Sequence, residues 1–188
     1  MNATEQVNIS DKTRWFEIIA VTITGLLKFI LFDWLNWHFV YVTSTVLFWA
    51  IYIVKKTKKN PSLLSYWGFS RKNLIESFRI TALFALVCIG LFLVFALAKG
   101  YRLWNIHIVF SLLTYPVWGL IQQFLIMSLV AGNLKDMKSV NLKNVQIIIP
   151  VSILFSVVHF PSIMLVMGTL ALAVFYSILF LRYRNLIH

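Results

Sequence analysis

Long apolar stretches, separated by short basic segments, dominate this sequence. A helix needs about 20 mostly apolar residues to cross a bilayer, and six stretches approach or exceed that length. Charged residues make up 12% of the chain, about half the share in an average soluble domain, so they are too few to cover a water-facing surface. The sequence therefore predicts an all-α polytopic membrane helix bundle, a single domain over residues 1–188. The predicted spans are 15–32, 34–54, 80–98, 106–131, 145–160 and 162–181.

The basic residues are unevenly distributed between the two sides that these spans define. Fourteen of the 17 Lys and Arg residues fall on one side, whereas Lys99 and Arg102 fall on the other and Lys28 lies inside the first span. Because cytoplasmic loops are enriched in Lys and Arg, both termini are predicted to be cytoplasmic. Orientation thus explains most of the net charge of +11. No nucleic-acid-binding motif accompanies the basic segments, so the predicted partner is the lipid bilayer and not nucleic acid.

Segment 62–78 is too polar to cross the membrane, although it contains several large apolar residues. These apolar residues lie on both sides of Arg71 and Lys72, and Arg79 follows them. Such a composition is typical of a segment that lies on the anionic inner leaflet. We therefore predict a cytoplasmic amphipathic segment here. The chain's one cysteine, Cys88, excludes a disulfide-based scaffold.

Polar residues inside the predicted spans are candidates for function, because each needs a partner or a cavity in hydrocarbon. Lys28 lies near the end of the first span, where its long side chain can reach the membrane surface. Asp33 follows five residues later, a spacing that does not favour one face of an α-helix. Neither residue is predicted to form a site.

Two adjacent amides, Gln122 and Gln123, lie well inside the fourth span. Neighbouring side chains on an α-helix point about 100° apart. If one of the two amides faces lipid, the other therefore faces the bundle. Interhelical hydrogen bonds, which are common between membrane helices, are the structural alternative to a functional role. The amides are therefore candidates for either structure or function.

The fifth span contains Phe155 and His159, which share a helix face because they are four residues apart. Pro161 follows and cannot continue the helical hydrogen-bond pattern. An imidazole at this depth can donate, accept or titrate. It is equally suited to catalysis and to a structural hydrogen bond within the bundle.

The order and spacing of these residues resemble the CPBP family, which comprises CAAX proteases and bacteriocin-processing enzymes and is also called Abi. The family has Glu-Glu-x-x-x-Arg on one membrane helix, Phe-x-x-x-His on the next, and a His with a following Asn on a later helix. The resemblance covers about residues 103–188. Phe155 and His159 match the second motif, and Gln122 and Gln123 occupy the paired-glutamate positions. It implies an intramembrane endopeptidase fold with His159, Gln122 and Gln123 at the catalytic positions.

The supporting positions match less completely. Trp118 and Gly119 match the context before the paired residues, whereas Met127 replaces the family arginine. The resemblance implies that a glutamate activates water, and a Gln amide has no useful basicity near neutral pH. The third-motif His is expected beyond the last residue, because His188 comes too early. The site is therefore predicted to be degenerate.

Three functions follow from this reading. The first is a protease-like protein that binds a peptide or lipidated segment without cutting it. The second is an active intramembrane protease, truncated in this chain, and the third is a non-enzymatic immunity or assembly protein. No cofactor is predicted, and no metal either, since His159 with amide neighbours makes a poor zinc site. The resemblance also implies a bacterial inner or plasma membrane.

Overall fold

The computed structural model of the chain describes residues 9–100 and 118–186. These residues form seven complete α-helices and two π-helical segments, and residues 118–123 are helical as well. In chain order the elements are α1 (Asp11–Leu27), η1 (Lys28–Trp34), α2 (His38–Lys59), α3 (Ser62–Tyr66), α4 (Leu74–Ala98), η2 (Phe124–Gly132), α6 (Asn133–Asp136), α7 (Asn144–Val157) and α8 (Ile163–Tyr183). The prediction of an all-α fold is confirmed for this part of the chain.

Four of the helices are long and apolar enough to cross a membrane, which indicates a multi-pass membrane protein. They are Asp11–Trp34 (α1 with η1), α2, α4 and α8, and they contain 21 to 25 residues each. They correspond to the first, second, third and sixth predicted spans. α7 has 14 residues, about 21 Å of helix, which is shorter than the hydrocarbon core of about 30 Å. The fourth predicted span, 106–131, begins outside the described residues.

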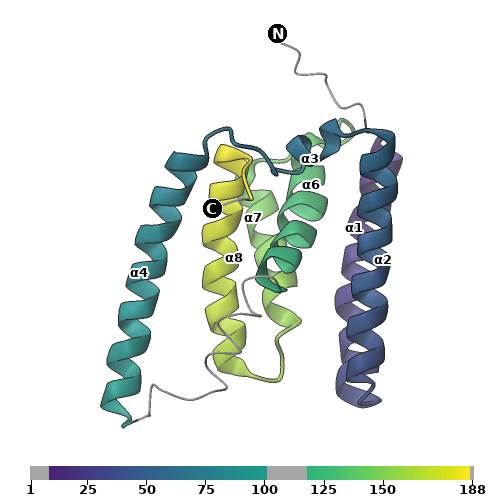
Figure 1. The fold of residues 1–188 in the computed structure, drawn as a ribbon. Coiled ribbons are helices and arrows are strands. Elements are labelled where there is room, and N and C mark those ends of the chain that lie inside the picture. The colour runs from purple at the N-terminus through teal and green to yellow at the C-terminus, as the bar shows by residue number, and fades with distance from the viewer. Residues whose placement is uncertain (1–8, 101–117, 187–188) are drawn as a thin grey trace.

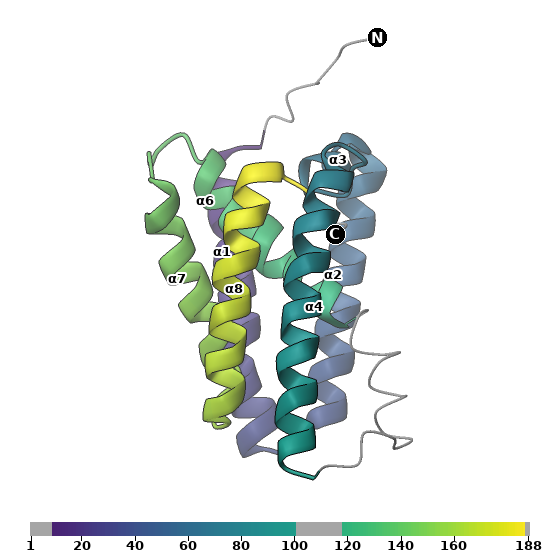
Figure 2. The ribbon, with the colours of Figure 1, turned by 90° about the vertical axis from the view of Figure 1, so that its left-hand side faces the viewer.

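The long helices stand side by side, with η2 among them and α4 at one edge (Figures 1 and 2). Both ends of the described chain lie at the end of the bundle that carries α3 and α6 (Figure 1). The Phe84 and Phe175 rings stack with centroids 3.9 Å apart and join α4 to α8. At the start of α1, the Ser10 hydroxyl caps the helix by accepting a hydrogen bond from the Thr13 backbone amide.

Every residue of η2 is buried. The sequence predicts an α-helix through this region, and the structure corrects that prediction to a π-helix from Phe124 to Gly132. π-Helical turns are rare and are frequent at functional sites. The segment contacts α1, α7 and α8, so its side chains form the centre of the core. Gln122 and Gln123 come directly before this buried segment, which therefore fixes where they lie in the bundle.

Segment 62–78 differs from the predicted membrane-surface segment. Leu63 and Trp67 are buried inside the protein, and the Ser128 hydroxyl of η2 donates to the Trp67 carbonyl. The Trp67 ring also packs edge-on against Phe124. Leu63 and Trp67 therefore reach the protein core, a contact that composition alone cannot distinguish from contact with lipid, whereas Leu64, Ile75 and Phe78 are exposed. Residues 74–78 belong to α4, which begins earlier than the predicted third span.

Gly68 permits the close approach of the chain end to α3. Its φ is +97°, and a Cβ there would lie 3.0 Å from Phe180 Cε2 and 3.2 Å from the Leu186 backbone nitrogen. The Leu186 amide donates to the Gly68 carbonyl at 2.9 Å. Any residue with a side chain would be strained at this positive φ, and its Cβ would lie too close to Phe180 and Leu186. The fold therefore requires glycine at this position.

We expect Gly68→Ala to lower the free energy of unfolding by at least about 2 kcal/mol. Unfolding in mixed micelles of denaturing detergent measures the change. Gly90→Ala is the control, because a Cβ at Gly90 meets nothing within 4 Å among the described residues. The control is expected to leave stability unchanged or slightly raised. Equal effects of the two substitutions would contradict this account of Gly68.

Candidate functional site

A cavity of about 840 Å³ lies inside the bundle, between α1, η1, α2, α7, α8 and the segment that leads into η2. This volume is within the range of about 300–1,000 Å³ that is typical of small-molecule sites. The cavity wall contains all seven residues that the sequence singles out: Trp118, Gly119, Gln122, Gln123, Met127, Phe155 and His159. The structure thus brings together residues from two segments that are more than 20 positions apart in the sequence.

Gln122 and Gln123 both line the cavity and are partly buried. The Gln123 side chain interacts with the Tyr176 hydroxyl of α8, and Tyr176 also lines the cavity. Among the described residues, the Gln122 amide makes no hydrogen bond. The two amides therefore differ within the described part of the chain: Gln123 contacts α8, and Gln122 lines the cavity without a hydrogen bond there.

His159 lies just beyond the end of α7, in a partly buried position on the cavity wall. Its Nδ1 is 2.9 Å from the Phe155 carbonyl oxygen, and the two rings pack with centroids 5.1 Å apart. A carbonyl oxygen only accepts, so this contact requires the proton on Nδ1 and leaves Nε2 as the acceptor of the neutral imidazole. Phe155 thus orients the ring and selects its tautomer.

Met127 and Gly119 add an apolar side chain and a position without a side chain to the cavity wall. Met127 is 3% exposed, and its sulfur accepts a hydrogen bond from the Ser177 hydroxyl at 3.5 Å. No cation therefore stands at the position that the family resemblance assigns to arginine. Gly119 also lines the cavity, and a Cβ there would meet nothing within 4 Å among the described residues.

Lys28 also lines the cavity, although the sequence does not predict it as part of a site. Its Nζ is 2.7 Å from Asp33 Oδ2 and 2.8 Å from the Phe160 carbonyl oxygen. The expectation that Lys28 and Asp33 do not share a helix face is wrong, because residues 28–34 form the π-helix η1. In a π-helix, residues five apart are neighbours along the axis. A π-helix has no reliable sequence signal, so spacing alone could not reveal this pair.

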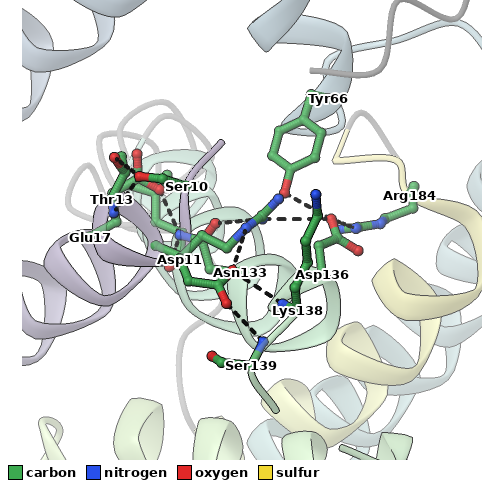
Figure 3. A network of polar contacts seen from close by, with 12 residues as sticks. Ser10, Asp11, Thr13, Glu17, Tyr66, Asn133, Asp136, Lys138, Ser139 and Arg184 are labelled. Carbon is green, nitrogen blue, oxygen red and sulfur yellow. Dashed lines mark hydrogen bonds and ion pairs between the residues drawn. The ribbon is translucent and has the colours of Figure 1, made fainter. Parts of the chain in front are cut away.

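A second polar cluster lies at the other end of α1 (Figure 3). Glu17 and Asn133 are 1% and 0% exposed, and the Asn133 amide donates to Glu17 Oε2 at 2.6 Å. Arg14 Nη1 donates to Asn133 Oδ1 at 3.2 Å, and the Tyr52 hydroxyl donates to Glu17. Sequence reasoning missed this cluster, although a carboxylate inside a predicted span is itself a signal.

Tyr66 extends the cluster from α3 toward α6 and α8. It accepts a hydrogen bond from Arg14 and donates to Asp136 Oδ2 at 2.8 Å. Burial and the nearby Asp136 carboxylate raise the pKa of Tyr66 to about 12, so its hydroxyl remains a donor at neutral pH. Arg184 pairs with the same carboxylate. Each charged group of this cluster has a protein partner, although Arg14 Nε is buried without a hydrogen bond among the described residues. The contacts join α1, α2, α3, α6 and α8, which favours a structural role.

Comparisons with known proteins identify no relative. No protein-family model, curated protein or solved structure matches this chain. Among the described residues, no group of three or more His, Cys, Asp or Glu side chains could hold a metal ion. The cavity and its side chains are therefore the basis for any functional proposal.

Proposed function

We propose that this membrane protein binds a hydrophobic peptide or lipidated segment in its intramembrane cavity and does not hydrolyse it. The observation that carries the proposal is the meeting of Gln122, Gln123 and His159 on the wall of one cavity. These hydrogen-bonding groups line a cavity whose other walls are mostly apolar. A site with a few polar groups among apolar walls is typical of ligand pockets.

The chemistry of the polar groups favours binding over hydrolysis. Hydrolysis of a peptide bond needs a base that activates water, and a Gln amide does not act as one. His159 Nε2 is then the basic atom of the site, without the carboxylate that the family resemblance implies beside it. Met127 also supplies no positive charge to hold a carboxylate or an oxyanion. The side chains offer donors and acceptors to an amide or ester group of a ligand, which is sufficient for recognition.

The resemblance to the CPBP family and the predicted orientation form part of this proposal. The family pattern agrees with the order of Gln122, Gln123, Phe155 and His159 along the chain. The excess of Lys and Arg on one side supports cytoplasmic termini. A plasma membrane with an anionic inner leaflet suits such a charge distribution.

We expect Gly119→Phe to reduce ligand capture at least about tenfold, because a benzyl group at this open position occupies the cavity. The probes are a short leucine-rich peptide with a photoactivatable leucine, and the same peptide carrying a thioether-linked isoprenoid. Protein in lipid nanodiscs is irradiated with each probe, and the crosslinked segments are identified by mass spectrometry. Wild-type crosslinks are expected in 118–127 and 154–159.

Gly168→Phe is the matched control, because Gly168 also has open space around it but does not line the cavity. It is expected to capture both probes as the wild type does. Comparison of the two probes identifies whether the peptide or the lipid chain is the bound part. Capture that Gly119→Phe leaves unchanged, or crosslinks confined to the lipid-facing side of α4, would contradict the proposal. Cleavage of either probe by the wild type would favour the alternative of an active protease.

A further inference from the structure

The candidate site depends on a short stretch of chain outside any regular helix. α7 ends at Val157, and the His159 and Phe160 amides donate to Ser156 and Val157 in tight turns. His159 therefore lies in the connection between α7 and α8 and not on a continuous helix. Its position in the cavity needs support from another element.

α1 supplies a close contact on one side of this connection. A Cβ at Gly25 would lie 3.0 Å from Val158 Cγ1, so the missing side chain lets α1 approach the residue before His159. Gly25 and Val158 both line the cavity. The close approach fixes the distance between α1 and the end of α7.

Lys28 supplies a directional contact on the other side. One turn after Gly25, its Nζ donates to the Phe160 carbonyl oxygen at 2.8 Å, and the ion pair with Asp33 holds the ammonium in place at 2.7 Å. The Phe29 and Phe32 rings lie 5.0 and 6.0 Å from the same nitrogen. Lys28 also interacts electrostatically with His159. α1 and η1 thus contact the residues on both sides of His159.

We propose that Lys28 is a positioning residue that fixes the orientation and tautomer of the His159 imidazole through the Phe160 carbonyl. The π-helical turn of η1 is what makes this possible, because it places Asp33 beside Lys28. With Lys28 held by Asp33, the 158–160 connection keeps Nδ1 of His159 on the Phe155 carbonyl and Nε2 free for a ligand. The importance of this orientation for ligand capture rests on the proposed function; the orientation itself does not.

Histidine NMR tests the proposal without any ligand. The full chain is labelled with ¹⁵N-histidine in nanodiscs, and the His159 signals are assigned by their loss in His159→Gln. The wild type is expected to show one His159 tautomer, protonated at Nδ1. Lys28→Met, which keeps the apolar stem but removes the charge and its donors, is expected to give mixed or broadened His159 signals. Lys28→Arg is expected to restore the single tautomer, since it keeps a cation and N–H donors.

Lys99→Met is the matched control, because Lys99 is an exposed cation at the C-terminal end of α4 and does not line the cavity. Its His159 signals are expected to match the wild type. Capture of the photoactivatable peptide should fall about tenfold in Lys28→Met, because the ligand then loses its hydrogen bond to His159 Nε2. It should be unchanged in Lys99→Met. A Lys28→Met protein with one Nδ1-protonated His159 species overturns the proposal.

The two proposals fail in different ways. If the wild type captures neither probe but Lys28→Met changes the His159 tautomer, the positioning role stands and the proposed function is wrong. If the wild type captures a probe and Lys28→Met changes neither capture nor tautomer, the positioning role is wrong and the proposed function stands. A lower unfolding temperature with unchanged His159 signals would assign Lys28 a purely structural role and also overturns the proposal.

Discussion

Asn133→Leu is expected to lower the free energy of unfolding by about 3–5 kcal/mol. The Asn133 side chain is fully buried and links two buried charged groups: its oxygen accepts from Arg14, and its nitrogen donates to Glu17 and to the Leu129 carbonyl. Leucine has a similar size but no hydrogen-bonding atoms. The substitution therefore leaves a guanidinium N–H and a carboxylate oxygen without this partner in a place that water does not reach.

The control for this prediction is Asn144→Leu. Asn144 is exposed, and its side chain accepts one hydrogen bond from Lys135 at 2.9 Å. Solvent can replace that contact, so the control should change stability little. Unfolding in mixed micelles with increasing denaturing detergent measures both variants. If Asn133→Leu is no less stable than Asn144→Leu, the cluster around Glu17 does not hold the helices together.

The positions of the long helices follow from hydropathy, which is why they could be predicted. Hydrocarbon excludes unpaired backbone polar groups, so an apolar stretch of sufficient length has one favourable structure. α2, α4 and α8 correspond to predicted spans for this reason. α7 has the right composition but fewer residues, and hydropathy does not set where a short buried helix stops.

The π-helical segments could not be predicted, and their effects on the site are large. Periodicity arguments assume 3.6 residues per turn, and they place Lys28 and Asp33 on different faces. The wider turn of η1 brings these two side chains to 2.7 Å. π-Helical turns are rare, so a prediction based on the regular α-helical spacing does not include them.

The cavity residues on the 118–127 segment and α7 were accessible to sequence reasoning because Gln and His are costly in hydrocarbon. Thr24 and Tyr176 were not. A Thr hydroxyl can bond to the carbonyl four residues earlier in its own helix, and a Tyr ring packs well in apolar surroundings, so neither residue stands out in the sequence. The Thr24 hydroxyl donates to the Ala20 carbonyl and also accepts from Trp49. Such residues become part of a site only through the packing of other helices around them.

Changing both Gln122 and Gln123 to Glu is expected to raise peptide hydrolysis by about 10²–10⁴ over the wild type. Both positions line the cavity with His159, so the substitutions add carboxylates where a water molecule can meet them. Two adjacent carboxylates in an apolar site do not both ionise at neutral pH, which leaves one as base and one as proton donor. Gln122→Glu alone should give more of the gain than Gln123→Glu, because Gln123 is engaged by Tyr176.

The control is Gln146→Glu, which makes the same chemical change outside the cavity. The Gln146 side chain accepts a hydrogen bond from the Lys143 backbone amide at 2.8 Å. This control is expected to hydrolyse nothing above the wild-type level in a peptide panel read by mass spectrometry. Adding His159→Ala to the double-glutamate variant should return its rate to that level, since the imidazole assists the carboxylate. Hydrolysis by the wild type that His159→Ala abolishes would show instead that His159 catalyses the reaction without a carboxylate beside it. In that case the chain is an active protease, and the proposal that it binds a ligand without cleaving it is wrong.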